Sequence, residues 1–375
     1  MSKNYYLPTR VVSGIDCIRE NAGRFAALGK AALIVTGGRS AKITGALQDV
    51  EEALASQGIR YAVYDKVTAN PTIPCAYDGA EAARAFGADF IVAIGGGSPM
   101  DAAKAMALLA AQTISPDKLF SGSYLPEALP IAAVPTTAGT GSEVTQYSIL
   151  TNDAAETKTS IATELIFPAI AFLDARYTES LPFETTVNTT IDALSHAVEG
   201  MLSVRASTFS DLQAKRSLHA IASTFPALLI WKRGETQGLS RAQRETLLFA
   251  STLAGMVIAQ TGTTAVHAMG YSLTYFKHVD HGRANGLLLG RYLAFAAEKN
   301  PERVASILSA GGFSNPDVFT DSLENLLGKR ESIDPEEAEK YAKLAAKTKN
   351  IANGIIPTTT EDMRQIYLDA LNGNK

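Results

Sequence analysis

The 375-residue sequence is poor in cysteine and has no excess of positive charge. Its two cysteines, Cys17 and Cys75, stand far apart in no paired motif, which argues against a disulfide scaffold and is typical of a reducing compartment. The formal net charge is −4 and no basic run is present, so we expect no nucleic-acid partner. No apolar run reaches membrane-spanning length and the first residues lack a signal-peptide core, so we expect a cytoplasmic protein with no membrane partner.

What is present is a globular composition, with 46% apolar and 19% charged residues, over a length that suggests two domains. The first half alternates strand-like and helix-like segments, and this alternation predicts a parallel sheet covered on both faces. Strands are expected at residues 30–38, 59–67 and 88–97 and from residue 129. Helices are expected at residues 40–58, 75–87 and 98–111.

Strand signals fade after about residue 181, and long helical patterns replace them at residues 185–203, 246–260 and 338–352. The predicted fold class is therefore α/β plus all-α. We expect a parallel-sheet domain at residues 1–180 and an all-helical domain at residues 181–375, with Pro182 at the junction.

A glycine-rich turn lies between the third predicted strand and the following helix. Its residues are Gly95, Gly96, Gly97 and Ser98. Glycine permits close approach of a ligand, and a helix N-terminus offers free N–H groups, so the turn suits a pyrophosphate. Met100 breaks the G-x-G-x-x-G fingerprint, and a simple tight turn is the alternative. Asp101 is either a first-turn acid that favours the helix dipole or a group that orients the substrate or nicotinamide.

A second turn follows the fourth predicted strand and carries four hydroxyl groups, on Thr136, Thr137, Thr140 and Ser142. Hydroxyl and N–H groups together can hold a phosphate or a ribose; the alternative is a polar loop with Ser142 as a helix cap. Two such turns in one sheet favour a nucleotide. Lys158 is either a further contact to a ribose or phosphate or a surface lysine.

A third turn, at Gly37 and Gly38, follows the first predicted strand. In dinucleotide folds, an acid near this point binds the adenosine ribose and repels a 2′-phosphate. The turn has no acid, and Arg39, Ser40 and Lys42 are suited to a phosphate. The turn therefore favours NADP(H), unless the glycines only form a bend.

Asp192 and His196 are four residues apart on a predicted helix and so share one face. His267 is expected at the end of the next long helix, and His281 follows fourteen residues later. Any of these histidines alone is more often a hydrogen-bonded core residue. Together with the carboxylate, the three imidazoles form a set suited to Fe(II), Zn(II), Co(II), Mn(II) or Ni(II).

The sequence resembles the iron-containing (group III) alcohol dehydrogenase family along nearly the whole chain. The shared motifs are GGGSPMDAAK, PTTAGTGSEVT, the D-A-x-x-H-A-x-E pattern from Asp192 to Glu199, VHAMG around His267 and HGRAN from His281. The resemblance implies a dehydroquinate-synthase-like fold, with a dinucleotide-binding domain followed by a helical metal-binding domain. It implies that Fe(2+), or Zn(2+) or another divalent ion, lies in the interdomain cleft, held by Asp192, His196, His267 and His281. It also implies cofactor contacts at Gly95, Gly96, Gly97, Ser98, Thr136, Thr137 and Lys158.

The chain departs from the family pattern at two positions. Many members carry an acid at the position of Gly37 and prefer NAD, so glycine here agrees with NADP(H). Many also have a proton-relaying histidine where this chain has Tyr271, and a phenol is a weaker base at neutral pH. His278 is a possible substitute, although a surface-loop role suits it better; Asp101 is the third catalytic candidate.

We therefore expect a metal-dependent, NAD(P)-linked alcohol dehydrogenase or aldehyde reductase, which moves a hydride between a small primary alcohol or aldehyde and the nicotinamide with the alcohol oxygen on the metal. The alternatives are a glycerol- or diol-type dehydrogenase, a ring-closing synthase of the same fold and an inactive nucleotide sensor. We expect a substrate pocket near Tyr147, Phe249, Leu253 and Tyr271. A homodimer or higher homo-oligomer is expected, with residues 4–14 as an edge strand able to pair across it.

Overall fold

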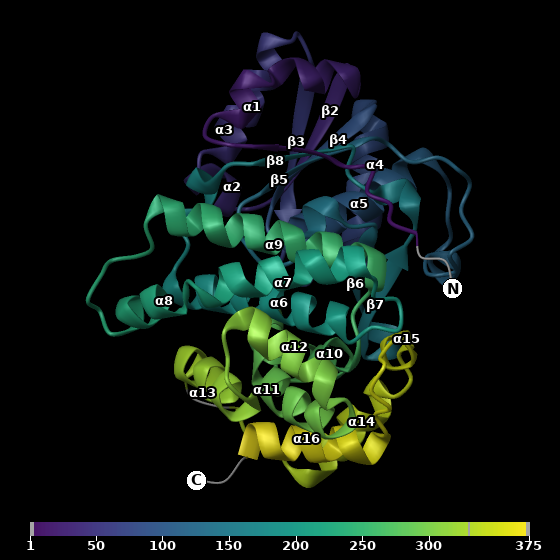
Figure 1. The fold of residues 1–375 in the computed structure, drawn as a ribbon. Helices are drawn as coiled ribbons and strands as arrows, with labels where there is room; N and C mark the ends of the chain where they lie inside the picture. The colour runs from purple at the N-terminus through teal and green to yellow at the C-terminus, as the bar shows by residue number, and fades with distance from the viewer. Residues whose placement is uncertain (1–3, 329–330, 373–375) are drawn as a thin grey trace. The chain divides into compact units, whose positions relative to one another are not determined.

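The computed structural model describes residues 4–328 and 331–372, which form two compact units (Figure 1). The sheet unit comprises Leu7–Thr137 and Gly141–Ser180. The helical unit comprises Met1–Tyr6, Ala138–Thr140 and Leu181–Lys375.

Six strands form one parallel sheet in the sheet unit, in the order β1-β8-β5-β4-β2-β3. Their bounds are β1 Arg10–Ser13, β2 Ala31–Gly37, β3 Arg60–Val67, β4 Phe90–Gly95, β5 Ile131–Pro135 and β8 Ile170–Leu173. The central strands β4 and β5 are buried along their whole length, as expected of short apolar strands covered on both faces. This confirms the predicted parallel sheet.

Helices cover both faces of this sheet (Figure 1). On one face, α1 and α3 pack with Phe25 against the apolar side chains of β2, β4, β5 and β8. On the other face, α4 and α5 pack together, and α5 contacts β4. The helices are α1 Cys17–Glu20, α2 Ser40–Ile43, α3 Ala46–Ser56, α4 Ile73–Phe86 and α5 Gly97–Ala111. Short 3₁₀ turns are η1 Ala22–Ala27, η2 Pro116–Lys118, η3 Ser142–Val144, η4 Asp153–Ala155, η5 Glu164–Ile166 and η6 Ala175–Thr178.

The sheet unit differs from the sequence-based expectation in three places. The helix expected at residues 40–58 is divided into α2 and α3, because Gly45 adopts a left-handed φ of 80° between them. An antiparallel hairpin of β6 Tyr147–Asn152 and β7 Thr157–Ala162 was not predicted. The edge strand expected at residues 4–14 is shorter: β1 lies at the edge of the sheet beside β8, but it covers only Arg10–Ser13.

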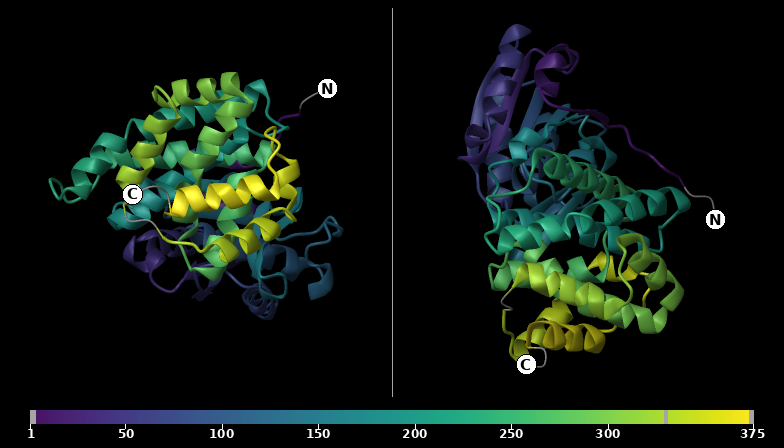
Figure 2. Two further views of the ribbon diagram at one scale, coloured as in Figure 1. Left: turned by 90° about the horizontal axis from the view of Figure 1, so that it is seen from below. Right: turned by 60° about the vertical axis from the view of Figure 1, so that its left-hand side comes forward.

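The helical unit contains eleven helices among its described residues. They are α6 Phe183–Met201, α7 Thr208–Ala222, α8 Phe225–Lys232, α9 Arg241–Thr261, α10 Ala265–Phe276, α11 His281–Lys299, α12 Pro301–Gly311, α13 Pro316–Leu327, α14 Pro335–Ala345, α15 Lys349–Ala352 and α16 Thr360–Asn372. A single apolar core joins them, and α6 packs against α7, α9 and α11. The C-terminal helix α16, in yellow in Figure 2, packs against α14 and α11. The predicted helical second half is confirmed.

Within residues 4–328 and 331–372, no single helix combines the length and apolar composition of a membrane span. Helices α9 and α10 meet those two criteria only when taken as a pair, and the chain bends by 109° between them.

Candidate metal centre

Helix α6 presents Asp192, His196 and Glu199 on one buried face. Residues four and seven positions apart on a helix project to the same side, so these side chains align along the helix axis. Asp192 and His196 are 3% and 4% exposed, and Glu199 is fully buried. Three ionisable groups on one buried face need partners from other elements, because an unpaired buried charge is very costly.

Helix α10 supplies His267 as its third residue. We expected His267 at the end of the preceding long helix, and this expectation was wrong. Helix α9 ends at Thr261 because Gly262 takes a positive φ of 66°, and α10 starts anew at Ala265. The break places His267 in the first turn of α10, where backbone N–H groups are still free of intrahelical partners.

Helix α11 starts at His281, which is its first residue. The side chain of Asp280 caps this helix by accepting hydrogen bonds from the N–H groups of Gly282 and Arg283, at 3.1 and 3.4 Å. One turn later on the same helix lies Asn285, which is fully buried.

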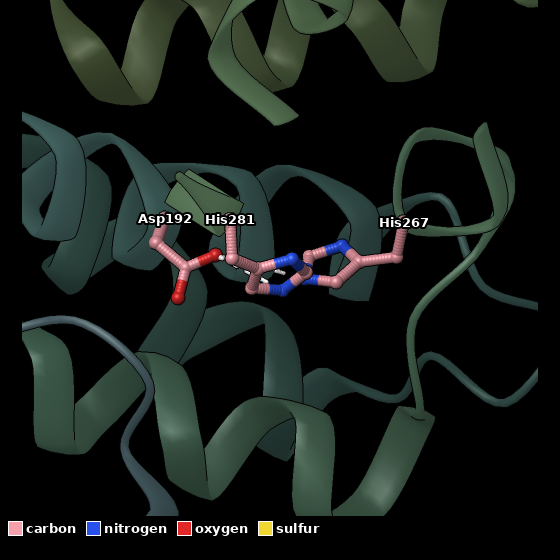
Figure 3. Close-up of side chains that lie close together, drawn as sticks. All are labelled: Asp192, His267 and His281. Carbon is pink, nitrogen blue, oxygen red and sulfur yellow. Dashed lines mark ion pairs between the residues drawn. The ribbon is translucent and has the colours of Figure 1, made fainter. Parts of the chain in front are cut away.

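The three helices bring the four predicted metal ligands together. One ligand atom each from Asp192, His267 and His281 lies within 4.8 Å of the others. Figure 3 shows these three side chains close together. The Oδ1 atom of Asp192 is 3.8 Å from Nε2 of His267 and 3.7 Å from Nε2 of His281. His196 joins the set through its own Nε2 atom, 3.0 Å from Nε2 of His267.

Glu199 fixes the orientation of His267. One carboxylate oxygen accepts from the N–H and hydroxyl of Thr264 at 2.9 and 2.8 Å and from the N–H of Val266 at 3.0 Å. The other oxygen pairs with Nδ1 of His267. The carboxylate thus satisfies the start of α10 and holds a proton on Nδ1, which leaves the Nε2 lone pair facing the other ligands. Burial opposes ionisation of Glu199, but His267 and Thr264 outweigh it, and the net pKa lies below its usual value.

The protonation states of the cluster suit a cation. Burial lowers the pKa of His196 to about 4, so its imidazole is neutral at pH 7. Burial also disfavours the charged form of Asp192, but the surrounding imidazoles more than compensate and its pKa is lowered. The carboxylate of Asp192 with the imidazoles of His267 and His281, and His196 beside His267, form a donor set that fits a divalent transition metal. Three of these side chains are buried, and that of His281 is 26% exposed.

The catalytic candidates Tyr271 and His278 occupy different surroundings. The ring of Tyr271 stacks on His281, with ring centroids 5.8 Å apart, and meets His267 edge-on at 6.4 Å. His278 lies in the exposed loop after α10, with a left-handed φ of 53°. Tyr271 is therefore the candidate that borders the cluster.

The residues expected around a substrate pocket belong to both units. Phe249 is 50% exposed on α9. Leu253, one turn later, is half-buried. Tyr147 belongs to β6 of the sheet unit.

In the sheet unit, the two predicted cofactor turns lie side by side. Gly95 pairs in register with Pro135, and the N–H of Thr136 donates to the carbonyl of Gly95 at 2.9 Å. A Cβ on Gly96 would approach the Thr137 hydroxyl to 3.0 Å, so only glycine allows this approach without displacement. Ser98 is in the first turn of α5, whose N-terminal N–H groups suit a phosphate. Thr140, by contrast, lies in the segment Ala138–Thr140, which packs with the helical unit.

Asp101 and Ser142 belong to a buried polar network. Asp101 is the fifth residue of α5, so the expectation of a first-turn acid was wrong. Its carboxylate accepts from the Ser142 hydroxyl at 2.7 Å and from the N–H of Ile149 at 3.0 Å. Ser142 is the first residue of a 3₁₀ turn that follows Gly141, and its hydroxyl is committed to Asp101, so it does not act as a helix cap.

Lys104 completes this network. Its Nζ donates to the hydroxyls of Ser142 and Thr145 at 2.7 and 3.0 Å and to the carbonyl of Tyr147 at 2.9 Å. Burial lowers the pKa of Lys104 to about 8. Burial raises the pKa of Asp101, and Lys104 and Ser142 partly offset that rise. Lys158, half-buried on β7, adds a weaker positive field at Asp101.

The third predicted turn ends strand β2 at Gly37, and Ser40 begins α2. A Cβ on Gly37 would lie 3.3 Å from the carbonyl oxygen of Val67, so the end of β3 borders the turn. A Cβ on Gly38 would lie 3.8 Å from the carbonyl oxygen of Asp65, an ordinary contact. Lys42 pairs with the Asp65 carboxylate at 3.1 Å. A side chain therefore fits at Gly38 without strain and at Gly37 after a small shift of its neighbour.

Comparison with known proteins identifies the family. Residues 8–175 match the family model "Iron-containing alcohol dehydrogenase", and residues 186–371 match "Fe-containing alcohol dehydrogenase family, C-terminal". The chain belongs to the iron-containing alcohol dehydrogenase family. It is an oxidoreductase with the dehydroquinate-synthase-like fold of that family.

Individual relatives of this family cover most of the chain. A sulfoacetaldehyde reductase from Bilophila wadsworthia is 32% identical over 81% of this chain and 77% of its own length. An NADPH-dependent butanol dehydrogenase from Clostridium saccharobutylicum is 33% identical over 80% of this chain and 76% of its own length. The crystal structure of an iron-containing alcohol dehydrogenase from Thermotoga maritima superposes with a TM-score of 0.91 at 38% identity, covering 99% of this chain and all of the other.

Three residues of this iron-containing alcohol dehydrogenase gain roles that the sequence-based reasoning missed: Glu199, Asn285 and Lys104. Each lies inside a motif that was used for other residues. The signal available for Glu199 was its spacing of three residues from His196, which places both on one helical face. Lys104 is likewise three residues after Asp101.

Proposed function

We propose that this protein is a divalent-metal-dependent, NAD(P)-linked alcohol dehydrogenase that also reduces aldehydes. The observation that carries the proposal is the convergence of a carboxylate and three imidazoles from α6, α10 and α11 in a buried cluster. Asp192, His196, His267 and His281 would hold the ion, with Fe(2+) first and Zn(2+) as an alternative.

When bound, a divalent ion would act as a Lewis acid on the oxygen of an alcohol or aldehyde, and a bound nicotinamide would give or receive the hydride. The protein's own part is to prepare the donors. Glu199 holds the proton on Nδ1 of His267, and Nε2 of His196 lies 3.0 Å from Nε2 of that ring. Burial of Asp192, His196 and His267 strengthens the electrostatic interactions among them.

Tyr271 is proposed to border the substrate. Its ring stacks on one ligand, His281, and meets a second, His267, so its phenol ring shields the cluster from one side. A hydroxyl at this position is able to pass a proton to and from an alcohol oxygen. His278 is exposed, and we therefore favour Tyr271 for this role.

We propose NADP(H) as the preferred cofactor, bound at the adjoining glycine and threonine turns. The absence of an acid at Gly37 and Gly38 and the presence of Arg39 and Ser40 support a 2′-phosphate there. The name of the Clostridium relative, an NADPH-dependent butanol dehydrogenase, also supports this choice.

The proposed substrates are small aldehydes and primary alcohols, in line with the names of the curated relatives. The test is NADPH and NADH oxidation with aldehydes of two to four carbons, and the reverse reaction with butanol, glycerol and 1,3-propanediol. We expect turnover to stop when a chelator strips the protein and to return with Fe(II) or Zn(II). Undiminished turnover after complete removal of the metal would refute the proposal, and a preference for glycerol or the diol would place the enzyme among the polyol dehydrogenases.

A further inference from the structure

A fully buried amide lies among the four proposed metal ligands. The Nδ2 atom of Asn285 is 3.0 Å from Oδ1 of Asp192, 3.1 Å from Nε2 of His267 and 3.3 Å from Nε2 of His281. An amide NH₂ group has two hydrogens, and here electron-rich atoms surround it. This group therefore lies between atoms that would otherwise repel one another.

The other end of the same amide is unsatisfied. Within the described part of the chain, Oδ1 of Asn285 is buried and accepts no hydrogen bond. It faces Gly270 of α10, where an added Cβ would lie 2.1 Å from it. A buried acceptor without a partner keeps the full cost of its lost hydration. Such a cost is unusual in a native core and indicates a second state in which the oxygen is used.

Metal binding and the observed hydrogen bonds exclude each other. An imidazole Nε2 has one lone pair, which either accepts an N–H or binds an ion. The NH₂ group of Asn285 must therefore leave His267 and His281 when a cation arrives. Rotation of the amide about its terminal bond exchanges the nitrogen for the oxygen, and an amide oxygen is a suitable donor to a divalent ion.

We propose that Asn285 is a fifth side chain of the metal centre, with a different role in each state. In the empty protein its NH₂ group holds Asp192 and the imidazoles together, and in the loaded protein its carbonyl oxygen faces the ion. Gly270 gives the amide the space in which to turn. The inference rests on the proposed function, because it requires that the cluster bind a metal.

The test compares Co(II) binding by the wild-type protein, Asn285→Leu and Asn285→Asp, through chelator competition and the visible absorption spectrum. Leucine keeps the approximate volume and removes both amide groups, so we expect Co(II) affinity to fall on the order of 10–100-fold, with an altered spectrum. Aspartate keeps an oxygen and loses the N–H groups. We expect it to bind Co(II) at least as tightly as the wild type, while the metal-free variant melts at a lower temperature because a second carboxylate adjoins Asp192.

Asn353→Leu is the matched control, because Asn353 is also buried in the helical unit and donates to the carbonyls of Thr261 and Thr263. It should lower stability without changing Co(II) affinity or spectrum. Unchanged or tighter Co(II) binding by Asn285→Leu would overturn the inference. Loss of Co(II) binding by Asn285→Asp would also overturn it. If the leucine variant does not fold, the result for Asn285→Asp decides. Failure of the wild-type protein to bind any divalent ion would instead overturn the proposed function.

Discussion

Glu199 decides which nitrogen of His267 faces the other ligands. It does not belong to the ligand set, yet its carboxylate joins the start of α10 to the imidazole ring. The same charge is stabilised by the free N–H groups of the first helical turn. One buried carboxylate therefore sets both the position of a helix and the chemistry of the histidine on it.

We expect Glu199→Gln to lower metal affinity by roughly 10–100-fold, because a neutral amide holds the Nδ1 proton of His267 less firmly. Competition with a chelator measures this affinity. Glu337→Gln is a suitable control, since Glu337 pairs with Lys277 in the same unit and outside the cluster. Equal affinities for the wild-type protein and Glu199→Gln would show that this carboxylate serves only the fold.

Lys104 is expected to make the free energy of unfolding depend on pH. Its pKa is about 8 in the folded protein against an ordinary value of 10.5, so the unfolded chain binds more protons between these values. The free energy of unfolding of the wild type should therefore rise relative to Lys104→Met as pH increases from about 8 to 10.5. The slope is at most ~1.4 kcal/mol per pH unit. Denaturant titrations at several pH values measure it, and a constant difference would contradict the assigned pKa.

At the scale of elements, the turns after β2, β4 and β5 carry the proposed cofactor chemistry. These strands are neighbours in one parallel sheet, so their carboxyl ends meet at one edge. The turns after β4 and β5 are in direct contact, while the turn after β2 borders the end of β3. Their spacing follows from strand order, which positions turns far apart in sequence along one edge.

Gly37→Asp tests the assignment of the turn after β2. The added carboxylate should repel a 2′-phosphate, and we expect kcat/KM for NADPH relative to NADH to fall about tenfold or more, or ~1.4 kcal/mol. The structure permits the substitution with a small shift, since the new Cβ would lie 3.3 Å from the Val67 carbonyl oxygen. Gly23→Asp adds the same charge elsewhere in the sheet unit and should leave the ratio unchanged. An unaltered ratio in Gly37→Asp would show that this turn does not meet the 2′ position.

The elements also show where sequence-based prediction succeeds. Buried strands such as β4 are continuous apolar runs that end in glycine, and they were predicted within a few residues. The hairpin of β6 and β7 was missed because its sequence is mostly polar and half-buried, without clear alternation. The break before His267 was missed because it depends on a positive φ at Gly262, which the apolar pattern on either side conceals.

At the scale of the whole molecule, the ligand set is assembled from residues up to 89 positions apart, counting from Asp192 to His281 (281 − 192). Motifs identified these four residues, but their separations depend on how α6, α10 and α11 pack. The same packing places Asn285 among them, and no spacing rule predicts which buried amide lies beside these side chains. Contacts between residues so far apart in the chain could not be predicted from this one sequence.

The most direct test of the account is the metal content of the purified protein. We predict a single tightly held divalent ion per chain in the wild type and almost none in His267→Ala. Nucleotide binding should be largely retained, since the turns proposed to bind the nucleotide belong to the sheet unit. His219→Ala, exposed on α7, should keep the ion. An active wild-type enzyme without a divalent ion, or a His267→Ala protein that retains both ion and turnover, would contradict the account.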